Sequence, residues 1–164
     1  MEWIVVFFVV AVVIAVLFVK GSNKYSYRIK GPLFSPAERS FLGVIDAAVA
    51  DTYRVFGKVR VADVLTPQKG MSRKHWQIAF NKISAKHFDY VLCCKDTLKI
   101  IAVIELDDKS HNKAASKNRD KLLKEACESA SLTLVRFPAK ASYSIAEVRQ
   151  SVADALNPPI EETR

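Results

Sequence analysis

The first 20 residues differ from the rest of the chain in their hydrophobic pattern. Residues 3–19 contain no polar or charged side chain (WIVVFFVVAVVIAVLFV), which predicts a helix about 25 Å long at roughly 1.5 Å per residue. This length lies at the short end of the range that spans a bilayer. A cleaved signal peptide would have a basic region before the apolar run and small residues at its cleavage site, whereas here Glu2 precedes the run and no Ala-x-Ala follows it. We therefore expect an uncleaved transmembrane anchor over residues 1–20.

A basic segment follows this apolar run and forms a linker over residues 21–34. Lysine and arginine residues beside a membrane span mark the cytoplasmic side. We therefore expect the N-terminus to lie outside, residues 3–19 to contact the membrane, and the remaining chain to lie in the cytoplasm. The basic residues concerned are Lys20, Lys24, Arg28 and Lys30.

Residues 35–157 show alternating helix and strand patterns that indicate one α/β domain. Two capping boxes, Ser35–Glu38 and Ser144–Glu147, predict helix starts, and runs rich in β-branched residues predict strands. The expected architecture is a mixed β-sheet flanked by helices, followed by an unfolded tail over residues 158–164. The predicted elements are a helix from residue 36, a strand over 55–65, a helix over 74–84, strands over 87–92 and 100–107, a helix over 115–130, a strand over 133–137 and a helix to about 156.

Acidic side chains stand inside two of the predicted strands, where carboxylates are otherwise costly. Asp89 lies in the first, and Glu105 and Asp107 lie in the second. Because the facing of a strand repeats every two residues, Glu105 and Asp107 are expected to point the same way, and Asp89 can join them if the strands are neighbours. Carboxylates held together repel one another unless a cation lies between them, and a hard divalent cation such as Mg²⁺ is the usual solution.

Structural roles stay open for the same residues. Asp107 could end a strand and begin a turn, and Asp89 could pair with Lys86 or Arg136 in a structural network. Glu38 is expected to cap the first helix of the domain rather than to bind a metal ion. The acids are therefore candidates for a site, with an alternative reading for each of them.

The charge of the domain is basic. The chain carries a net charge of +8, and about +6 remains on the domain alone. That balance suits an anionic partner, either nucleic acid or an anionic lipid surface, although moderate positive charge also aids solubility. The three cysteines contain no C-x-x-C pair, so neither a zinc site nor a disulfide framework is indicated. A basic helical face is the candidate nucleic-acid-binding surface, unless it is merely solvated; it comprises Lys113, Lys117, Arg119 and Lys121.

The segment from about residue 41 to 156 resembles an uncharacterised bacterial family, domain of unknown function 2726. The resemblance is carried by VRVADVL at 59–65, AFNKISAKHFD at 79–89, IELDDKSH at 104–111 and the pair Arg119-Asp120. Through that family the chain resembles, more distantly, the very-short-patch-repair-like endonucleases of the PD-(D/E)XK superfamily. The resemblance implies a restriction-endonuclease-like α/β fold, here preceded by one N-terminal transmembrane helix, and phosphodiester hydrolysis with Mg²⁺ or Mn²⁺.

The resemblance also implies roles for individual residues. By position, Asp89 matches the first acid of the superfamily and Glu105 the second, whereas Asp107 stands where a lysine is usual. All three acids would then be metal ligands. Another lysine would have to supply the missing positive charge, and His111 would move protons, unless it lies in a solvated loop. The candidate catalytic residues are Asp89, Glu105, Asp107, Lys109, His111 and Lys86.

We therefore expect a single-span protein of the bacterial inner membrane whose cytoplasmic domain hydrolyses nucleic acid, with DNA preferred to RNA. A second hypothesis is a catalytically inactive module that binds nucleic acid or protein at the membrane, and the aspartate at position 107 favours it. A third is a purely structural domain beside the membrane.

Overall fold

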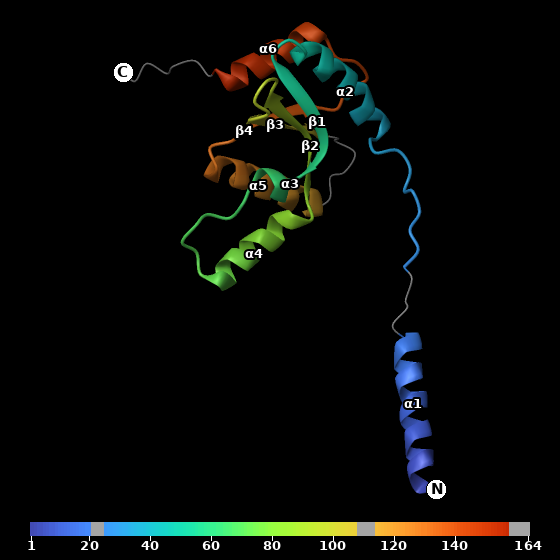
Figure 1. Cartoon of the computed structure of the whole chain (residues 1–164). Helices are drawn as coiled ribbons and strands as arrows, with labels where there is room; N and C mark the ends of the chain where they lie inside the picture. The colour runs from blue at the N-terminus through green and yellow to red at the C-terminus, as the bar shows by residue number, and fades with distance from the viewer. Residues whose placement is uncertain (21–24, 108–113, 158–164) are drawn as a thin grey trace. The chain divides into compact units, whose positions relative to one another are not determined.

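The computed structural model describes residues 1–20, 25–107 and 114–157. The chain divides into two units, Met1–Pro32 and Leu33–Arg164 (Figure 1).

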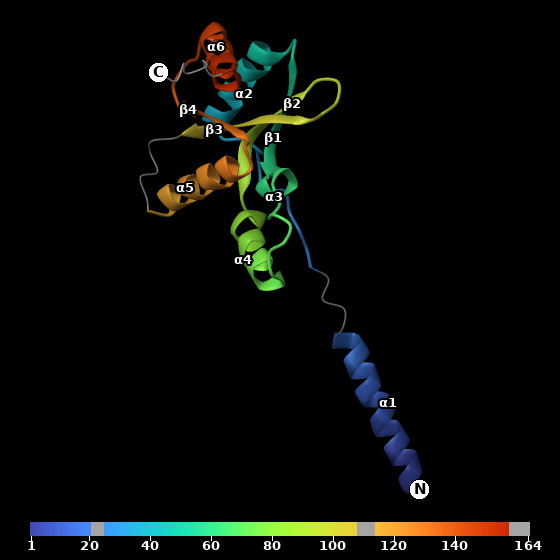
Figure 2. The same cartoon turned by 90° about the vertical axis from the view of Figure 1, so that its left-hand side faces the viewer.

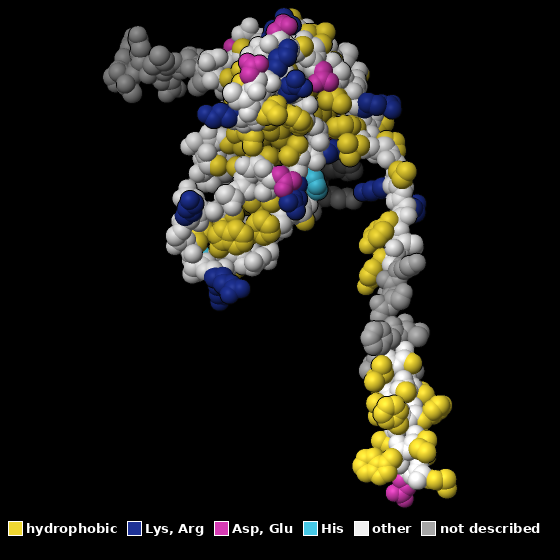
Figure 3. All heavy atoms as spheres, in the orientation of Figure 1, with side chains coloured by type: hydrophobic (Ala, Val, Ile, Leu, Met, Phe, Trp, Pro, Cys, Tyr) yellow, Lys and Arg dark blue, Asp and Glu magenta, His cyan; other side chains and the backbone are white. Residues whose placement is uncertain are grey.

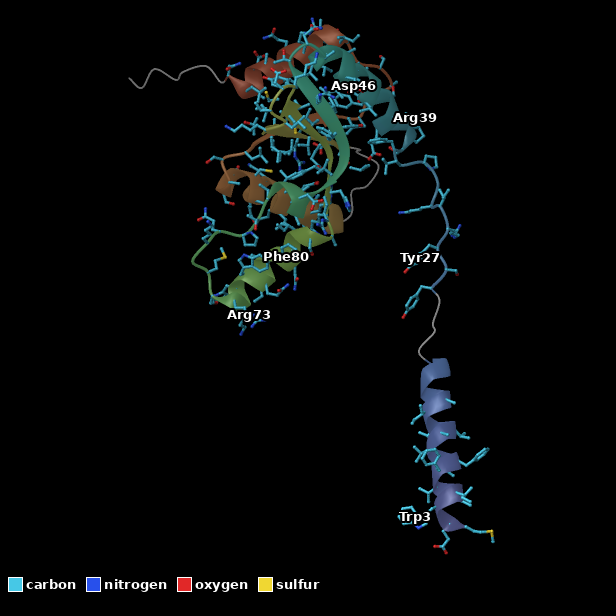
Figure 4. All side chains as sticks on the ribbon, viewed as in Figure 1. Trp3, Tyr27, Arg39, Asp46, Arg73 and Phe80 are labelled. Carbon is cyan, nitrogen blue, oxygen red and sulfur yellow. The ribbon has the colours of Figure 1, made fainter. Side chains whose placement is uncertain are left out.

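The N-terminal unit contains the helix α1 (Glu2–Lys20), from which side chains such as Trp3 project (Figure 4). Among the described residues, no helix combines the length and the apolar character needed to cross a bilayer. The apolar run of α1 extends about 25 Å, which is shorter than a hydrocarbon core of about 30 Å. The predicted transmembrane anchor over residues 1–20 is therefore wrong.

The predicted single-pass location in the bacterial inner membrane is wrong for the same reason. The outside position of the N-terminus and the cytoplasmic position of the domain were derived from that location, so these two predictions are withdrawn with it. The predicted membrane contact through residues 3–19 is not tested by this finding and stays a prediction. The fold class is corrected to an α/β domain that no transmembrane helix precedes within the described residues.

The second unit has the alternating helices and strands that the sequence predicted. One difference is α3, a short helix where the strand over 55–65 was expected to continue; there the amide of Leu65 donates to the carbonyl of Val61 at 2.8 Å. The elements are α2 (Pro36–Val49), β1 (Tyr53–Arg60), α3 (Val61–Val64), α4 (Arg73–Ser84), β2 (His87–Cys94), β3 (Ile100–Asp107), α5 (Ala114–Ser129), β4 (Thr133–Pro138) and α6 (Ile145–Leu156).

The four strands form one mixed sheet in the order β1-β2-β3-β4 (Figure 1). The pairs β1–β2 and β2–β3 are antiparallel, whereas β3 and β4 are parallel. A parallel pair needs a crossover connection, and α5 lies in the segment that supplies it. The predicted mixed sheet flanked by helices is therefore confirmed.

Helices cover both faces of the sheet (Figure 2). On one face, Tyr90 and Ile104 pack in a buried cluster with α2 and α6. On the other face, Val91 and Val103 pack in a second cluster that includes Leu123 of α5. Successive side chains of a strand point to opposite faces of the sheet. Val103 and Glu105 are two residues apart on β3, so both side chains point toward the face that α5 covers. The sheet thus places an acidic side chain on a covered face.

Phe41 is the central side chain of the first cluster. It has no exposed surface, and its ring lies 5.6 Å from that of Tyr90, 5.0 Å from that of Phe137 and 4.8 Å from that of Tyr143. The aromatic contacts therefore join α2 to two strands and to the segment before α6.

We expect Phe41→Ala to lower the free energy of unfolding by about 3–5 kcal/mol, because it removes a ring from a closely packed core. Phe56→Ala is the matched control, since Phe56 is 42% exposed, and its cost should stay below about 1 kcal/mol. Urea denaturation of the two variants measures both values, and equal losses would contradict the assignment of Phe41 to the core.

Candidate functional site

A polar pocket of about 460 Å³ lies at one end of the sheet, beside the start of α2 and the first half of α5. Four carboxylates and three cationic side chains line it, so it is rich in charge. Its walls are formed by Ser35, Ala37, Glu38, Lys58, Asp89, Leu106, Asp107, Arg119, Asp120 and Arg136.

Asp89 and Glu105 lie side by side on β2 and β3, one step beyond the register pair Tyr90–Ile104. The amide of Asp89 donates to Glu105 Oε1 at 3.3 Å, and the amide of Leu106 donates to Asp89 Oδ2 at 3.0 Å. Each strand therefore holds the carboxylate of the other. Asp89 is 7% exposed and Glu105 is 1% exposed, and the proximity that the sequence led us to expect is present.

Lys58 supplies a cation that no motif in the sequence indicated. Its Nζ lies 2.6 Å from Glu38 Oε1 and 2.9 Å from Asp89 Oδ1, so one ammonium group bridges two carboxylates. Burial alone would lower the pKa of Lys58, but its hydrogen bonds to these carboxylates raise the pKa above the usual value. The lysine therefore stays charged.

The backbone at Lys58 is unusual for a strand. Its φ is 54°, a left-handed conformation that costs a non-glycine residue about 1 kcal/mol or more. The regular pairing of β1 with β2 includes Gly57–Tyr90 and Val59–Phe88 on either side. Lys58 thus stands opposite Asp89 at an irregular point of the ladder. The glycine that interrupts the apolar pattern at position 57 was the only signal of this feature in the sequence.

Glu38 has two roles, one through each oxygen. Its Oε2 accepts a hydrogen bond from the amide of Ser35 at 2.8 Å, which completes the predicted capping box, and its Oε1 binds Lys58. Burial alone would raise the pKa of Glu38, but the hydrogen bond from Lys58 and that from Ser35 lower it. The predicted cap is therefore confirmed, and the same side chain also faces the pocket.

Two arginines complete the charge arrangement. Arg119 lies 2.8 Å from Glu105 Oε2 and also donates to the carbonyl of His87 at 3.1 Å. Arg136 lies 3.1 Å from Asp107 Oδ1 and 3.5 Å from an oxygen of Asp120. The network contains five carboxylates and three cationic groups. Its net charge is therefore −2 when every group is ionised.

Glu105 is the most strongly perturbed acid of the site. Burial, together with the negative charge of Asp89, raises its pKa from 4.5 to about 7, although Arg119 acts in the opposite direction. A carboxylate in this position holds a proton more tightly than it would in the unfolded chain.

The other predicted site residues fall into three groups. Asp107 lines the pocket but contacts Arg136, and Lys86, which follows α4, does not line it. Lys117 and Lys121 are exposed on α5, so Arg119 is the member of the predicted nucleic-acid-binding set that the structure places in the pocket. The remaining predicted residues, Lys109, His111 and Lys113, lie outside the described residues.

The described part of the chain contains no group of three His, Cys, Asp or Glu side chains arranged to hold one metal ion. The joint role of Asp89, Glu105 and Asp107 as metal ligands therefore stays a prediction. Asp89 and Glu105 form a close pair, and Asp107 stands apart from them through its contact with Arg136.

Comparison with known proteins identifies the family. Residues 30–156 match the family described as "Protein of unknown function (DUF2726)". This match covers most of the chain, which therefore belongs to that family, as its sequence motifs led us to expect. Neither the curated proteins nor the solved structures contain a match to the chain, so the comparisons provide no evidence for the more distant link to PD-(D/E)XK endonucleases.

The pKa of Glu105 makes stability depend on pH. Between pH 4.5 and about 7 the folded chain keeps the proton of Glu105 while the unfolded chain releases it. The contribution of protonated Glu105 to the free energy of unfolding is therefore full below pH 4.5 and is lost as the pH rises through about 7. Glu105→Gln removes this titration. We expect the free energy of unfolding of the variant, relative to wild type, to rise by on the order of 3 kcal/mol across this window.

Urea denaturation at a series of pH values measures this difference. Glu128→Gln is the matched control, because its side chain is 62% exposed on α5, and its difference from wild type should stay nearly constant over the same range. A constant difference for Glu105→Gln would contradict the raised pKa.

Proposed function

We propose that the pocket hydrolyses phosphodiester bonds of nucleic acid with Mg²⁺ or Mn²⁺, and that DNA is its substrate. The observation that carries this proposal is the adjoining pair of buried carboxylates, Asp89 and Glu105, with the ammonium group of Lys58 beside them. Two acids and one cation at the end of a sheet are the groups that such a reaction needs. The positions of Asp89 and Glu105 in the sequence, which resemble those of the two acids of PD-(D/E)XK endonucleases, favour the same proposal.

The donor set fits a hard divalent cation. Mg²⁺ is usually bound by one or two carboxylates together with water molecules and substrate phosphates, rather than by a complete protein cage. Asp89 and Glu105 supply two carboxylates, so a third protein ligand is not required. When Glu105 and the other four carboxylates are all ionised, the net charge of −2 in the network also matches the charge of one divalent cation. When bound, the metal would lower the pKa of a water molecule and offset the charge of the phosphate.

The residues around the two acids have separate tasks in this proposal. Lys58 donates from its ammonium group to an oxygen of the reacting phosphate and stabilises the negative charge that develops there. It thereby supplies the positive charge that Asp107 cannot. Arg119 and Arg136 line the pocket and bind neighbouring phosphates, which positions the substrate without reading its sequence.

A second function is a metal-free binding module, and one observation favours it. Every carboxylate oxygen of Asp89 and Glu105 already has a partner within the chain. A metal ion would therefore compete with Lys58 for Asp89 and with Arg119 for Glu105. In the second function these ion pairs are permanent, and the pocket binds phosphate through its cationic groups alone.

Cleavage assays test the leading proposal. With single- and double-stranded DNA and RNA in the presence of Mg²⁺ or Mn²⁺, we expect cleavage that Asp89→Asn and Glu105→Gln each reduce by about 100-fold or more. Asp63→Asn is the matched control, because Asp63 is paired with Arg60 at an exposed position and does not line the pocket. Activity that both site variants retain would refute the assignment.

Replacing the bridging lysine separates the two functions. We expect Lys58→Met to lower the free energy of unfolding by about 1–3 kcal/mol, because Glu38 and Asp89 lose the cation they share. If the acids bind a divalent cation, millimolar Mg²⁺ recovers part of this loss. Arg60→Met is the control; its exposed pair with Asp63 should contribute at most about 1 kcal/mol, and Mg²⁺ should have no effect on that variant.

Denaturation with and without Mg²⁺ measures both effects. Destabilisation of Lys58→Met that Mg²⁺ does not relieve would favour the metal-free module over the nuclease.

A further inference from the structure

An aromatic pair on α4 belongs to neither of the two hydrophobic core clusters. The rings of Trp76 and Phe80 are stacked, with centroids 5.1 Å apart and planes inclined by 10°. Both side chains are only half-buried, and neither belongs to the two core clusters or to the residues packed against them. Large aromatic rings usually contribute to a core, so this pair calls for another explanation.

The segment that carries this pair is strongly basic. Residues 65–86 contain five Lys or Arg residues and no Asp or Glu. Four of the five are exposed and one is half-buried, and none forms an ion pair with any residue that the structure describes. They are Lys69, Arg73, Lys74, Lys82 and Lys86.

The α5 face that the sequence suggested for nucleic-acid binding is less suitable. There Lys121 lies 3.7 Å from Glu125, and Lys124 lies 3.7 Å from Glu128. The glutamates of these pairs offset the positive charge of the lysines, which would otherwise bind a phosphate backbone. The basic residues of α4 and of the loop before it have no such acidic neighbours in sequence, so α4 presents the stronger positive surface.

Helical spacing places a cationic group next to the rings. Arg73, Trp76 and Phe80 follow one another at intervals of three and four residues, and residues at these intervals share one side of a helix. Figure 4 shows Arg73 at the start of α4 and Phe80 further along the helix. In Figure 3 a hydrophobic patch lies over α4 and is bordered by Lys and Arg side chains.

We propose that α4 is a platform on which unpaired bases of single-stranded nucleic acid stack. The face of the Trp76–Phe80 pair receives a base, while the surrounding Lys and Arg side chains contact phosphates, which is how proteins bind single strands without sequence preference. A duplex offers no free base faces to this platform, because its bases are already stacked. The inference rests on the proposed function for the identity of the ligand and adds that the substrate has a single-stranded segment.

Fluorescence of Trp76 tests whether a base contacts the platform. The chain contains two tryptophans, so Trp3→Phe leaves Trp76 as the single reporter in the full-length protein. In EDTA, where no cleavage interferes, we expect an oligodeoxythymidylate of about 12 nucleotides to quench this fluorescence. An abasic strand with the same number of phosphates should bind without quenching, and a blunt duplex should quench much less. A single-stranded oligoribonucleotide should quench as well.

Affinity measurements on variants test the contribution of the rings. We expect Trp76→Leu and Phe80→Leu each to weaken binding of a labelled single strand by about 5- to 150-fold. Ile78→Ala is the matched control, because Ile78 is 46% exposed on the same helix and is not part of the stacked pair; its affinity should stay near that of wild type. Fluorescence anisotropy gives these affinities, and circular dichroism checks that each variant is folded.

Salt dependence tests the charged part of the platform without altering the rings. For a single strand, each phosphate contact contributes about 0.7 to the slope of log affinity against log salt. Arg73→Gln and Lys74→Gln should each reduce the slope by about that amount, whereas Lys124→Gln on α5 should leave it unchanged.

Three results would overturn the inference. They are binding of the single strand without quenching of Trp76, equal affinities for Trp76→Leu and wild type, and equal quenching by the abasic strand. None of them bears on catalysis, because these measurements exclude metal ions. Conversely, loss of cleavage activity in Asp89→Asn with unchanged quenching would support the proposed active site and the platform separately.

Discussion

The ammonium group of Lys58, shared between Glu38 and Asp89, is the interaction on which the site depends. It joins α2, β1 and β2 at one end of the sheet. Without it, two carboxylates would face each other in a region partly shielded from water, where unpaired charge is costly. The unfavourable backbone of Lys58 persists because this double ion pair holds it. The position of the lysine is therefore fixed by the acids, and the lysine offsets their negative charge.

Buried charge beside the pocket follows the same logic, although Glu105 does not itself line the pocket. Glu105 is almost completely buried, yet its oxygens are bound by the amide of Asp89 and by Arg119. Within the described residues, no buried side-chain polar atom lacks a hydrogen-bond partner, as expected of a well-packed polar site. A site of this kind is stable without a ligand but leaves a negative charge that is not offset. The same geometry therefore accommodates either a divalent cation or permanent ion pairs, and the choice depends on how readily Lys58 and Arg119 release the acids.

Much of the fold could be predicted because the signals were local. Capping boxes at Ser35 and Ser144 and the β-branched runs around Asp89 and Glu105 predicted the order of helices and strands. The apolar run of α1 led to a wrong prediction, because its composition was given more weight than its length. In the site, proximity of Asp89 and Glu105 followed from the alternation of two neighbouring strands, whereas the partners of Asp107 and Glu105, which are Arg136 and Arg119, could not be predicted.

The sequence by itself determined the family, the α/β architecture and the pair of acids in adjacent strands, because these depend on motifs and periodicities within short segments. Only the tertiary structure decided which cations accompany those acids. Lys58 lies 31 positions from Asp89 in the chain, and Trp76 and Phe80 could have belonged to either core. Contacts between distant segments depend on sheet register and helix packing, which no local pattern encodes.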